Sequence, residues 1–382
     1  MIDIKKYYYD IGNEDINMML FGDLHYSDKF NDKKLDLIYN KLKNSEYIFI
    51  AGDLLDSTDV VNNIDKRDKL IKFLEKVSKK SKVFITLGNH DLAIRNKHKK
   101  AKDDNNEFWL EVSKIDGIYL SRYNNYYEDD KIIVYLLEQD YDYYYKNKHE
   151  SRELLLDRIK EDKILFNSID SNKIKIVLCH SPINISNKDV SNELENFNFI
   201  FCGHMHNGMM PYYLDKIIKG NRGLMSPDNR LFADNTRGVK DINNTHLIIS
   251  GGITKLSKTS GIFRYFNFIY PMSIDNIVIK KGKINITMRS SKNAGIGSWK
   301  GKMNVNIRDC SINIDNQGND VAGIGDIFGS GNVFIKNSDI DIKISASNPI
   351  DIGTEKGNTK LQENKISSVI NGKQISHEQT GV

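Results

Sequence analysis

The sequence predicts an α/β fold with a short β-solenoid at its C-terminal end, and three observations support this prediction. Strand and helix patterns alternate between Met18 and His90, which favours parallel strands joined by crossover helices. Gly-containing polar motifs follow several apolar runs, where the carboxyl ends of strands are expected. Apolar residues near the C-terminus recur at a fixed spacing of 28 positions, which is typical of stacked β-coils.

The first part of the chain contains the strands and helices of the α/β fold. Short apolar runs predict strands at residues 18–21, 47–51 and 83–87, and helical spacing predicts helices at 32–43 and 64–79. Further elements are expected later in this part, namely strands at 132–137, 173–179, 197–202, 246–251 and 275–279 and an amphipathic helix at 151–167. The order predicts a β-α-β-α-β unit at the start of the domain.

The last part of the chain carries the internal repeat. Apolar residues recur 28 positions apart, namely Val305, Ile307, Ile312 and Ile314 as Val333, Ile335, Ile340 and Ile342, and Ala294-Gly295-Ile296-Gly297 as Ala322-Gly323-Ile324-Gly325. An earlier set at this spacing, Ile277, Ile279, Ile284 and Ile286, is either a third copy or part of a hairpin that closes the first domain.

These patterns divide the chain into a domain at residues 1–288 and a repeat-containing β-solenoid tail at 289–382. A stack of so few coils needs a cap or a packing partner. We therefore expect the tail to pack on the first domain, on a partner or on another copy of the chain. The polar end after Gly353 is expected to fray.

Composition argues against several classes of protein. The 382 residues are 39% hydrophobic and 28% charged, and no stretch approaches the roughly 20 apolar residues of a membrane span. Residues 1–10 lack the apolar core of a signal peptide, and the three cysteines, Cys179, Cys202 and Cys310, do not suggest a disulfide framework. The net charge of +4 comes from intermixed lysines and acids, so no specific nucleic-acid partner is evident. We expect a cytoplasmic protein.

Five short segments carry side chains that suit divalent metals: Gly22-Asp23-Leu24-His25, Gly52-Asp53-Leu54-Leu55-Asp56, Gly88-Asn89-His90-Asp91, His180 and Gly203-His204-Met205-His206. A two-metal site needs a bridging carboxylate, several terminal ligands and a water of lowered pKa. We predict that Asp23 and His25 face one metal, that Asp53 bridges, and that Asn89 offers its amide oxygen to the second metal. His180, His204 and His206 complete the ligands as neutral imidazoles. His204 and His206 either reach different ions, or one of them ligates while its carbonyl orients the other.

His90 and Asp91 are the predicted catalytic residues. His90 is expected to donate a proton to the leaving oxygen or to stabilise charge there, while Asp91 accepts a hydrogen bond that fixes the tautomer of His90. Asp56 either supports the site in a comparable way or caps a helix. Each motif alone has a plainer explanation, because Gly-Asp pairs are ordinary in turns and at helix caps. Five of the nine histidines fall in these motifs, however, and together they predict a metal site.

The motifs GDLH, GDLLD, GNHD, a lone His before Ser-Pro, and GHMH resemble, in order and approximate spacing, the signature of the calcineurin-like metallophosphoesterase superfamily. The resemblance covers residues 17–279. It implies two mixed β-sheets packed face to face with helices outside, and two divalent metals, usually Mn, Fe or Zn. It also implies ligand sets, namely Asp23, His25, Asp53 and His206 for one metal and Asp53, Asn89, His180 and His204 for the other, with His90 assisting the departing group.

The implied activity is hydrolysis of a phosphomonoester, phosphodiester or pyrophosphate bond by attack of a metal-bridging hydroxide. Residues 246–250 and 261–279 also resemble the bacterial branch that includes lipid-linked phosphohydrolases, although Asn207-Gly208-Met209 stands where Gly-Gly-Gln is commoner. The expected substrate is a phosphorylated small molecule or a lipid-linked one. The alternative is an adaptor whose tail, which resembles Gly-rich β-helical repeats of bacterial surface proteins, binds a partner or glycan beside a vestigial catalytic domain. The tyrosine clusters, Tyr7 to Tyr9 and Tyr141, Tyr143, Tyr144 and Tyr145, are expected to be partly exposed strand and loop residues rather than an aromatic wall for substrate.

Overall fold

The computed structural model divides the chain into two compact units, which are Met1–Tyr7 with Ile16–Val278, and Tyr8–Asp15 with Ile279–Val382. The structure describes residues 2–9, 11, 15–92, 106–139, 141–145, 148–162, 173–215, 217, 221–227, 231–242, 244–253, 272–279, 282–290, 292–298, 304–308, 310–336, 338–362 and 364–377. No helix of these residues is long and apolar enough to cross a membrane.

The first unit begins with a six-stranded mixed sheet in the order β1-β12-β2-β3-β4-β5. Its strands are β1 (Ile2–Tyr9), β2 (Ile16–Phe21), β3 (Tyr47–Ala51), β4 (Lys82–Thr86), β5 (Ile118–Leu120) and β12 (Met272–Ile279). Strands β2, β3, β4 and β5 pair with one another in parallel, as the predicted β-α-β-α-β unit requires. Strand β1 was not predicted, and the predicted strand at 275–279 belongs to β12, which lies between β1 and β2.

The second sheet of this unit also has six strands, in the order β10-β11-β9-β8-β7-β6. These are β6 (Tyr126–Glu128), β7 (Ile132–Leu136), β8 (Ile174–Leu178), β9 (Phe199–Cys202), β10 (Gly238–Ile242) and β11 (Thr245–Ile249). Strands β7, β8, β9 and β11 are parallel, and the edge strands β6 and β10 are antiparallel to their neighbours. The carboxyl ends of the parallel strands therefore lie along one edge.

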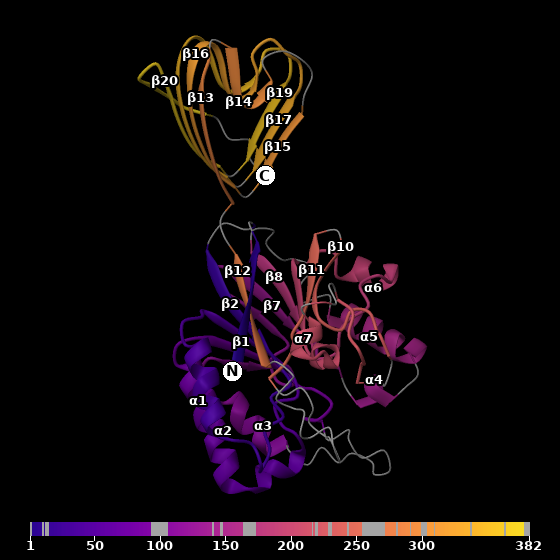
Figure 1. Cartoon of the computed structure of the whole chain (residues 1–382). Helices are drawn as coiled ribbons and strands as arrows, with labels where there is room; N and C mark the ends of the chain where they lie inside the picture. The colour runs from indigo at the N-terminus through magenta and orange to yellow at the C-terminus, as the bar shows by residue number, and fades with distance from the viewer. Residues whose placement is uncertain are drawn as a thin grey trace. The chain divides into compact units, whose positions relative to one another are not determined.

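Helices cover the outer faces of both sheets (Figure 1). On the first sheet they are α1 (Lys33–Leu42), α2 (Ile64–Ser78) and α3 (Asn106–Ser113), and on the second α5 (Lys148–Asp162) and α6 (Lys188–Glu193). The shorter helices of this unit are η1 (Thr58–Asn62), α4 (Tyr141–Tyr145), η3 (His206–Met209) and α7 (Tyr212–Asp215). Helix α2 buries Leu70, Leu74 and Val77, which share a core with Ile48 and Ile50 of β3. This burial on one stripe follows from the helical spacing of its apolar residues. The predicted helix at 151–167 begins at Lys148, and residues 163–167 lie outside the described part.

The two sheets pack face to face. The ring of Phe49 on β3 lies 4.9 Å from that of Phe201 on β9, and the ring of Phe84 on β4 lies 5.0 Å from that of Tyr127 on β6. The hydroxyl of Tyr47 on β3 donates to the carboxylate of Asp129 beside β6, at 2.8 Å. The predicted α/β fold with two facing mixed sheets is confirmed.

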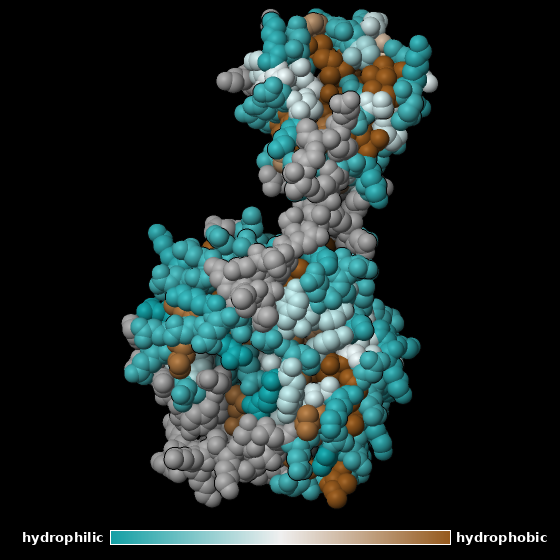
Figure 2. Space-filling view, turned by 180° about the vertical axis from the view of Figure 1, so that it is seen from behind, coloured by the Kyte–Doolittle hydropathy of each residue, from teal (hydrophilic) through white to brown (hydrophobic). Residues whose placement is uncertain are grey.

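The second unit is built of mostly parallel strands in two sheets, of which β16 and β18 are the longest (Figure 1). The strands are β13 (Gly282–Arg289), β14 (Lys292–Ser298), β15 (Asn304–Arg308), β16 (Cys310–Asp326), β17 (Asn332–Lys336), β18 (Asp339–Thr354), β19 (Asn358–Gln362), β20 (Lys365–Ile370) and the antiparallel β21 (Lys373–Ile375). Figure 2 shows hydrophobic side chains of this unit between hydrophilic ones.

The 28-residue repeat of the sequence corresponds to in-register pairing of these strands. Ile312 on β16 pairs with Ile340 on β18, and Val305 on β15 pairs with Val333 on β17. These apolar residues form one buried core. Ile284 of β13 pairs with Ile312 at the same spacing, whereas Ile277 belongs to β12 of the first unit. The expectation that the chain frays after Gly353 is wrong as far as Ile375, because β19 and β20 pair in parallel with β17 and β18.

Candidate metal centre

The predicted site residues follow the strands of both sheets at one edge. Asp23 and His25 follow β2, Asp53 follows β3, and Asn89, His90 and Asp91 follow β4. On the second sheet, His180 follows β8, and His204 and His206 follow β9. Because the parallel strands end at the same edge of each sheet and the sheets face one another, side chains far apart in sequence converge there.

The backbone is strained at this edge. Asp23, His25, Asp53, His204 and His206 all have positive φ, at 51°, 48°, 51°, 66° and 47° respectively. For residues with a Cβ this conformation costs about 1–2 kcal/mol each. Such strain concentrates at functional sites, where surrounding contacts hold it in place. Here Asp23 and His25 of one loop reach the same cluster of side chains, whereas His204 and His206 of another loop reach different clusters.

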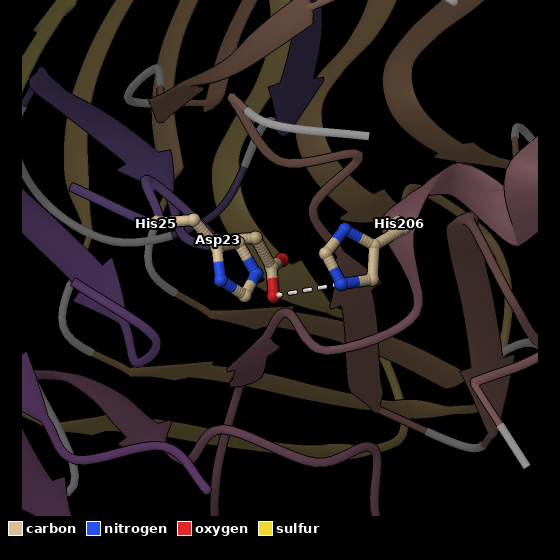
Figure 3. Close-up of side chains that lie close together, drawn as sticks. All are labelled: Asp23, His25 and His206. Atoms are coloured by element: carbon tan, nitrogen blue, oxygen red, sulfur yellow. Dashed lines mark ion pairs between the residues drawn. The ribbon is translucent and has the colours of Figure 1, made fainter. Parts of the chain in front are cut away.

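One cluster consists of Asp23, His25 and His206, which Figure 3 shows pointing toward one another. One ligand atom from each lies within 4.8 Å of the others. The His206 Nε2 atom is 3.8 Å from Asp23 Oδ1, and the rings of His25 and His206 stack with centroids 5.2 Å apart. These oxygen and nitrogen atoms suit a divalent transition metal.

A second cluster consists of Asp53, His180 and His204, with Asn89 beside them. The Nε2 atom of His180 lies 3.4 Å from Asp53 Oδ2, 3.1 Å from Asn89 Oδ1 and 3.1 Å from His204 Nδ1. The other ring nitrogen of His180, Nδ1, lies 2.7 Å from the carbonyl oxygen of Ala51. This hydrogen bond places the proton on Nδ1, which leaves Nε2 as the nitrogen that faces the cluster.

Asp53 lies between the two clusters. Its Oδ2 atom is 3.7 Å from His25 Nε2 as well as 3.4 Å from His180 Nε2. Its Oδ1 atom accepts a hydrogen bond of 2.8 Å from the backbone N–H of His90. A single carboxylate therefore reaches both groups of imidazoles, which is the geometry of a bridging ligand.

Burial and charge set the protonation states of this site. Burial would raise the pKa of Asp53, but the neighbouring His180 and His90 outweigh it and hold that pKa well below its usual value. Burial would lower the pKa of His180, but the Asp53 charge raises it to about 9. Burial lowers the pKa of His25, and burial together with the charge of His180 lowers the pKa of His204.

The residues present fit a metal. Both ring nitrogens of His25 are buried and make only long contacts, with Nδ1 3.5 Å from Asp56 Oδ1 and Nε2 3.7 Å from Asp53 Oδ2. Such weak contacts would be costly for a buried imidazole without a ligand. With a lowered pKa, His25 and His204 are neutral at physiological pH and have a lone pair for a cation. A dication beside Asp53 would also replace the proton that His180 otherwise holds. The donor set of carboxylate, amide and imidazole suits Mn, Fe or Zn.

The structure corrects the predicted partner of His90. The Nδ1 atom of His90 lies 2.7 Å from the carbonyl oxygen of Asp56, so this carbonyl, and not the Asp91 carboxylate, fixes the tautomer. Asp91 instead accepts hydrogen bonds from the backbone N–H groups of Leu54, Leu55 and Gly88, at 3.2, 2.9 and 2.9 Å. Burial and the Asp53 charge raise the pKa of Asp91 to about 7. Asp91 therefore holds the loops after β3 and β4 together.

Other residues support the site without having been predicted. A Cβ on Gly252, which has a φ of +77°, would lie 2.9 Å from the Asp23 side chain, and a Cβ on Gly88 would overlap Asp53. The ring of Tyr144 lies 6.2 Å from His180 and 5.9 Å from His204, so this tyrosine lies beside the metal site, contrary to the expectation for its cluster. The Gly251-Gly252 pair after β11 is a sequence signal for the close contact of Gly252 with Asp23, whereas nothing in the motif spacing indicates that Tyr144 lies at the site.

Fold and site together define a metal-dependent hydrolase of phosphoric esters. Residues 16–208, about half of the chain, match the family described as calcineurin-like phosphoesterase, and the chain belongs to this family. Among solved structures, the chain is similar to a phosphopantetheinyl hydrolase from Mycobacterium tuberculosis, with 12% identity, 63% of this chain and 91% of that chain covered, and a TM-score of 0.37. A second solved chain matches at 10% identity over 62% of this chain and 91% of its own, with a TM-score of 0.33. A search of curated proteins found no significant match.

Proposed function

We propose that the chain hydrolyses a phosphomonoester, phosphodiester or pyrophosphate bond at a dinuclear metal site. Asp23, His25, Asp53 and His206 would hold one ion, and Asp53, Asn89, His180 and His204 the other. When bound, the two ions supply an activated water and neutralise charge on the phosphoryl oxygens. The position of Asp53 between the two clusters, 3.7 Å from His25 and 3.4 Å from His180, is the observation that carries this proposal.

His90 is the proposed proton donor to the leaving oxygen. Because its Nδ1 faces the carbonyl of Asp56 at 2.7 Å, Nδ1 carries a proton and Nε2 is the nitrogen left to act on a substrate. Donation from Nε2 requires the imidazolium form, in which both ring nitrogens carry a proton. General acid catalysis of this kind contributes typically 10²–10⁴-fold.

The test uses p-nitrophenyl phosphate and bis-p-nitrophenyl phosphate with added Mn²⁺. Asp53→Asn should lower kcat/KM for the preferred substrate about 10³-fold or more and should reduce the bound metal. Asp36→Asn is the matched control, since the side chain of Asp36 lies on α1 and is 74% exposed. Unchanged turnover and metal content in Asp53→Asn would show that Asp53 is not the bridge.

Substrate and location belong to the same proposal. We infer a phosphorylated small molecule or a lipid-linked phosphate as substrate, from the resemblance of the motifs. A reducing, cytoplasmic setting is supported by Cys179 and Cys202, which are buried free thiols at the ends of β8 and β9. A screen of nucleotides, sugar phosphates and lipid pyrophosphates with the metal-loaded enzyme tests the substrate class.

We propose that the second unit is a short β-solenoid and that residues 1–288 suffice for catalysis. In-register pairing at the repeat spacing and one shared isoleucine core support the solenoid. Ile342→Asp would bury a charge in that core and should destabilise the unit by about 3–5 kcal/mol, whereas Lys343→Asp on the exposed face should change little. Equal melting curves for these neighbours would contradict the solenoid, and an inactive chain ending at Met288 would contradict the boundary.

A further inference from the structure

Asp326 is a buried carboxylate of the second unit that the proposed catalysis does not use. It is the last residue of β16, and its side chain has 0% exposure. Neither of its carboxylate oxygens makes a hydrogen bond. A buried, charged oxygen pair without a partner is strongly unfavourable, so such groups are normally paired with a cation or protonated.

Residues with hydroxyl side chains occupy the positions that pair with Asp326 on the two neighbouring strands. The in-register pairing places Ser298 of β14 on one side of Asp326 and Thr354 of β18 on the other. Adjacent strands are about 4.8 Å apart, so both hydroxyls are within reach of an ion held by the carboxylate. Thr354 Oγ1 donates to the carbonyl oxygen of Gly331 at 3.1 Å, so a backbone oxygen lies beside this hydroxyl.

The backbone of this region permits the close approach. The glycines before these residues, Gly297, Gly325 and Gly353, have φ of 147°, 128° and 139°, a conformation that only glycine adopts readily. A Cβ on Gly325 would overlap the backbone of Gly353. Three strands can therefore bend together directly before the Ser298, Asp326 and Thr354 positions.

We propose that Asp326, the hydroxyls of Ser298 and Thr354, and the carbonyl of Gly331 form a calcium site in the second unit. The donors are all hard oxygens, and a carboxylate with hydroxyl and backbone oxygens in irregular geometry suits Ca²⁺ better than Mg²⁺, which demands near-ideal octahedral geometry. The ion would connect three consecutive coils of the stack. This site is independent of the proposed catalytic function, since its residues belong to the other unit.

The test measures calcium stoichiometry by equilibrium dialysis on the full chain after removal of metal with a chelator. Asp326→Asn should bind one Ca²⁺ per chain fewer than the wild type and should lose a calcium-dependent rise in the melting temperature of the second unit. Asp320→Asn is the matched control, because Asp320 lies on the same strand, is only partly buried and faces Asn348 at 3.5 Å. Calcium bound by the first unit is present in all these variants and cancels in the comparison.

A second variant covers the case in which Asp326→Asn does not fold. Thr354→Val keeps the carboxylate and should raise the Kd of the same ion about tenfold. Equal calcium stoichiometry in the wild type and Asp326→Asn would overturn the proposal, because it would show that Asp326 holds no Ca²⁺. An unchanged Kd in Thr354→Val would overturn it as well.

Discussion

Asp129 offers a sharp test of how the two sheets of the first unit are held together. Its Oδ2 atom accepts hydrogen bonds from the hydroxyls of Tyr47 and Tyr127, both at 2.8 Å. Its Oδ1 atom accepts from the backbone N–H groups of Lys131 and Ile132, both at 2.9 Å. Since Tyr47 lies in the first sheet and Tyr127 in the second, one carboxylate joins both sheets.

The expected effect of Asp129→Asn follows from these four bonds. The amide oxygen of Asn can still accept from the two backbone N–H groups, but the charge is lost and an NH₂ group faces the two tyrosines. Hydrogen bonds to a charged acceptor contribute about 1.5–3 kcal/mol each, and neutral ones about 1 kcal/mol. Because Asp129 is only partly buried, we take the lower end and expect a loss of about 2–3 kcal/mol in the free energy of unfolding.

The pH dependence of unfolding tests the same prediction independently. Burial would raise the pKa of Asp129, but hydrogen bonds from the backbone N–H groups and the two tyrosines hold it below the usual value of 3.8. The stabilisation is therefore complete above the unfolded-state pKa, about 3.9, and is lost as the pH falls through the lower folded-state pKa. The difference between wild type and Asp129→Asn should be constant from pH 7 to about 5 and should shrink below about pH 4.

Urea unfolding at several pH values measures this difference, with Trp109 fluorescence as the probe because Trp109 is buried in the core of the first unit. Asp130→Asn, the exposed neighbour, is the control and should stay within about 0.5 kcal/mol of the wild type. If both variants unfold alike, or if the Asp129→Asn deficit persists unchanged at pH 3, the inter-sheet role assigned to Asp129 is wrong.

Three further predictions concern the metal site. Gly252→Ala should raise the metal concentration needed for half-maximal activity about 10–100-fold, because the added Cβ would lie 2.9 Å from the Asp23 side chain. A metal titration identical to that of the wild type would contradict this prediction. Lys5→Met should weaken metal binding about tenfold with little change in kcat at saturating metal, because Lys5 Nζ donates to Asn207 Oδ1 at 3.1 Å and Asn207 directly follows His206. A fall in kcat without a change in metal affinity would indicate that Lys5 contacts the substrate instead. Removal of metal with EDTA should abolish hydrolysis, and added Mn²⁺ should restore it. Mn²⁺ at 100 times its Kd should also increase the free energy of unfolding of the first unit by about 2.7 kcal/mol and raise its melting temperature. Hydrolysis that survives full metal depletion would rule out the proposed chemistry.

Much of the fold could be predicted because its signals are local. The strands that carry Asp23, Asp53 and Asn89 are short apolar runs, and the helices between them show apolar residues at helical spacing. The 28-residue spacing in the tail corresponds to the pairing of Ile312 with Ile340. Strand β1, with its tyrosines and lysines, was missed because its pairing partner β12 is about 270 positions away, as the contact of Tyr7 with Asp275 at |i−j| of 268 illustrates.

The sequence alone was sufficient to name the residues that meet at the carboxyl edge of the sheets, since each motif directly follows an apolar run and parallel strands end on one side. It could not reveal that the carbonyl of Asp56 and not Asp91 faces His90 Nδ1, or that Tyr144 lies beside His180. These relations depend on strand order, on left-handed backbone at the loop residues and on contacts between the two sheets. Such contacts join residues that are distant in the chain and form only when the two sheets pack together. No local sequence pattern can therefore predict them.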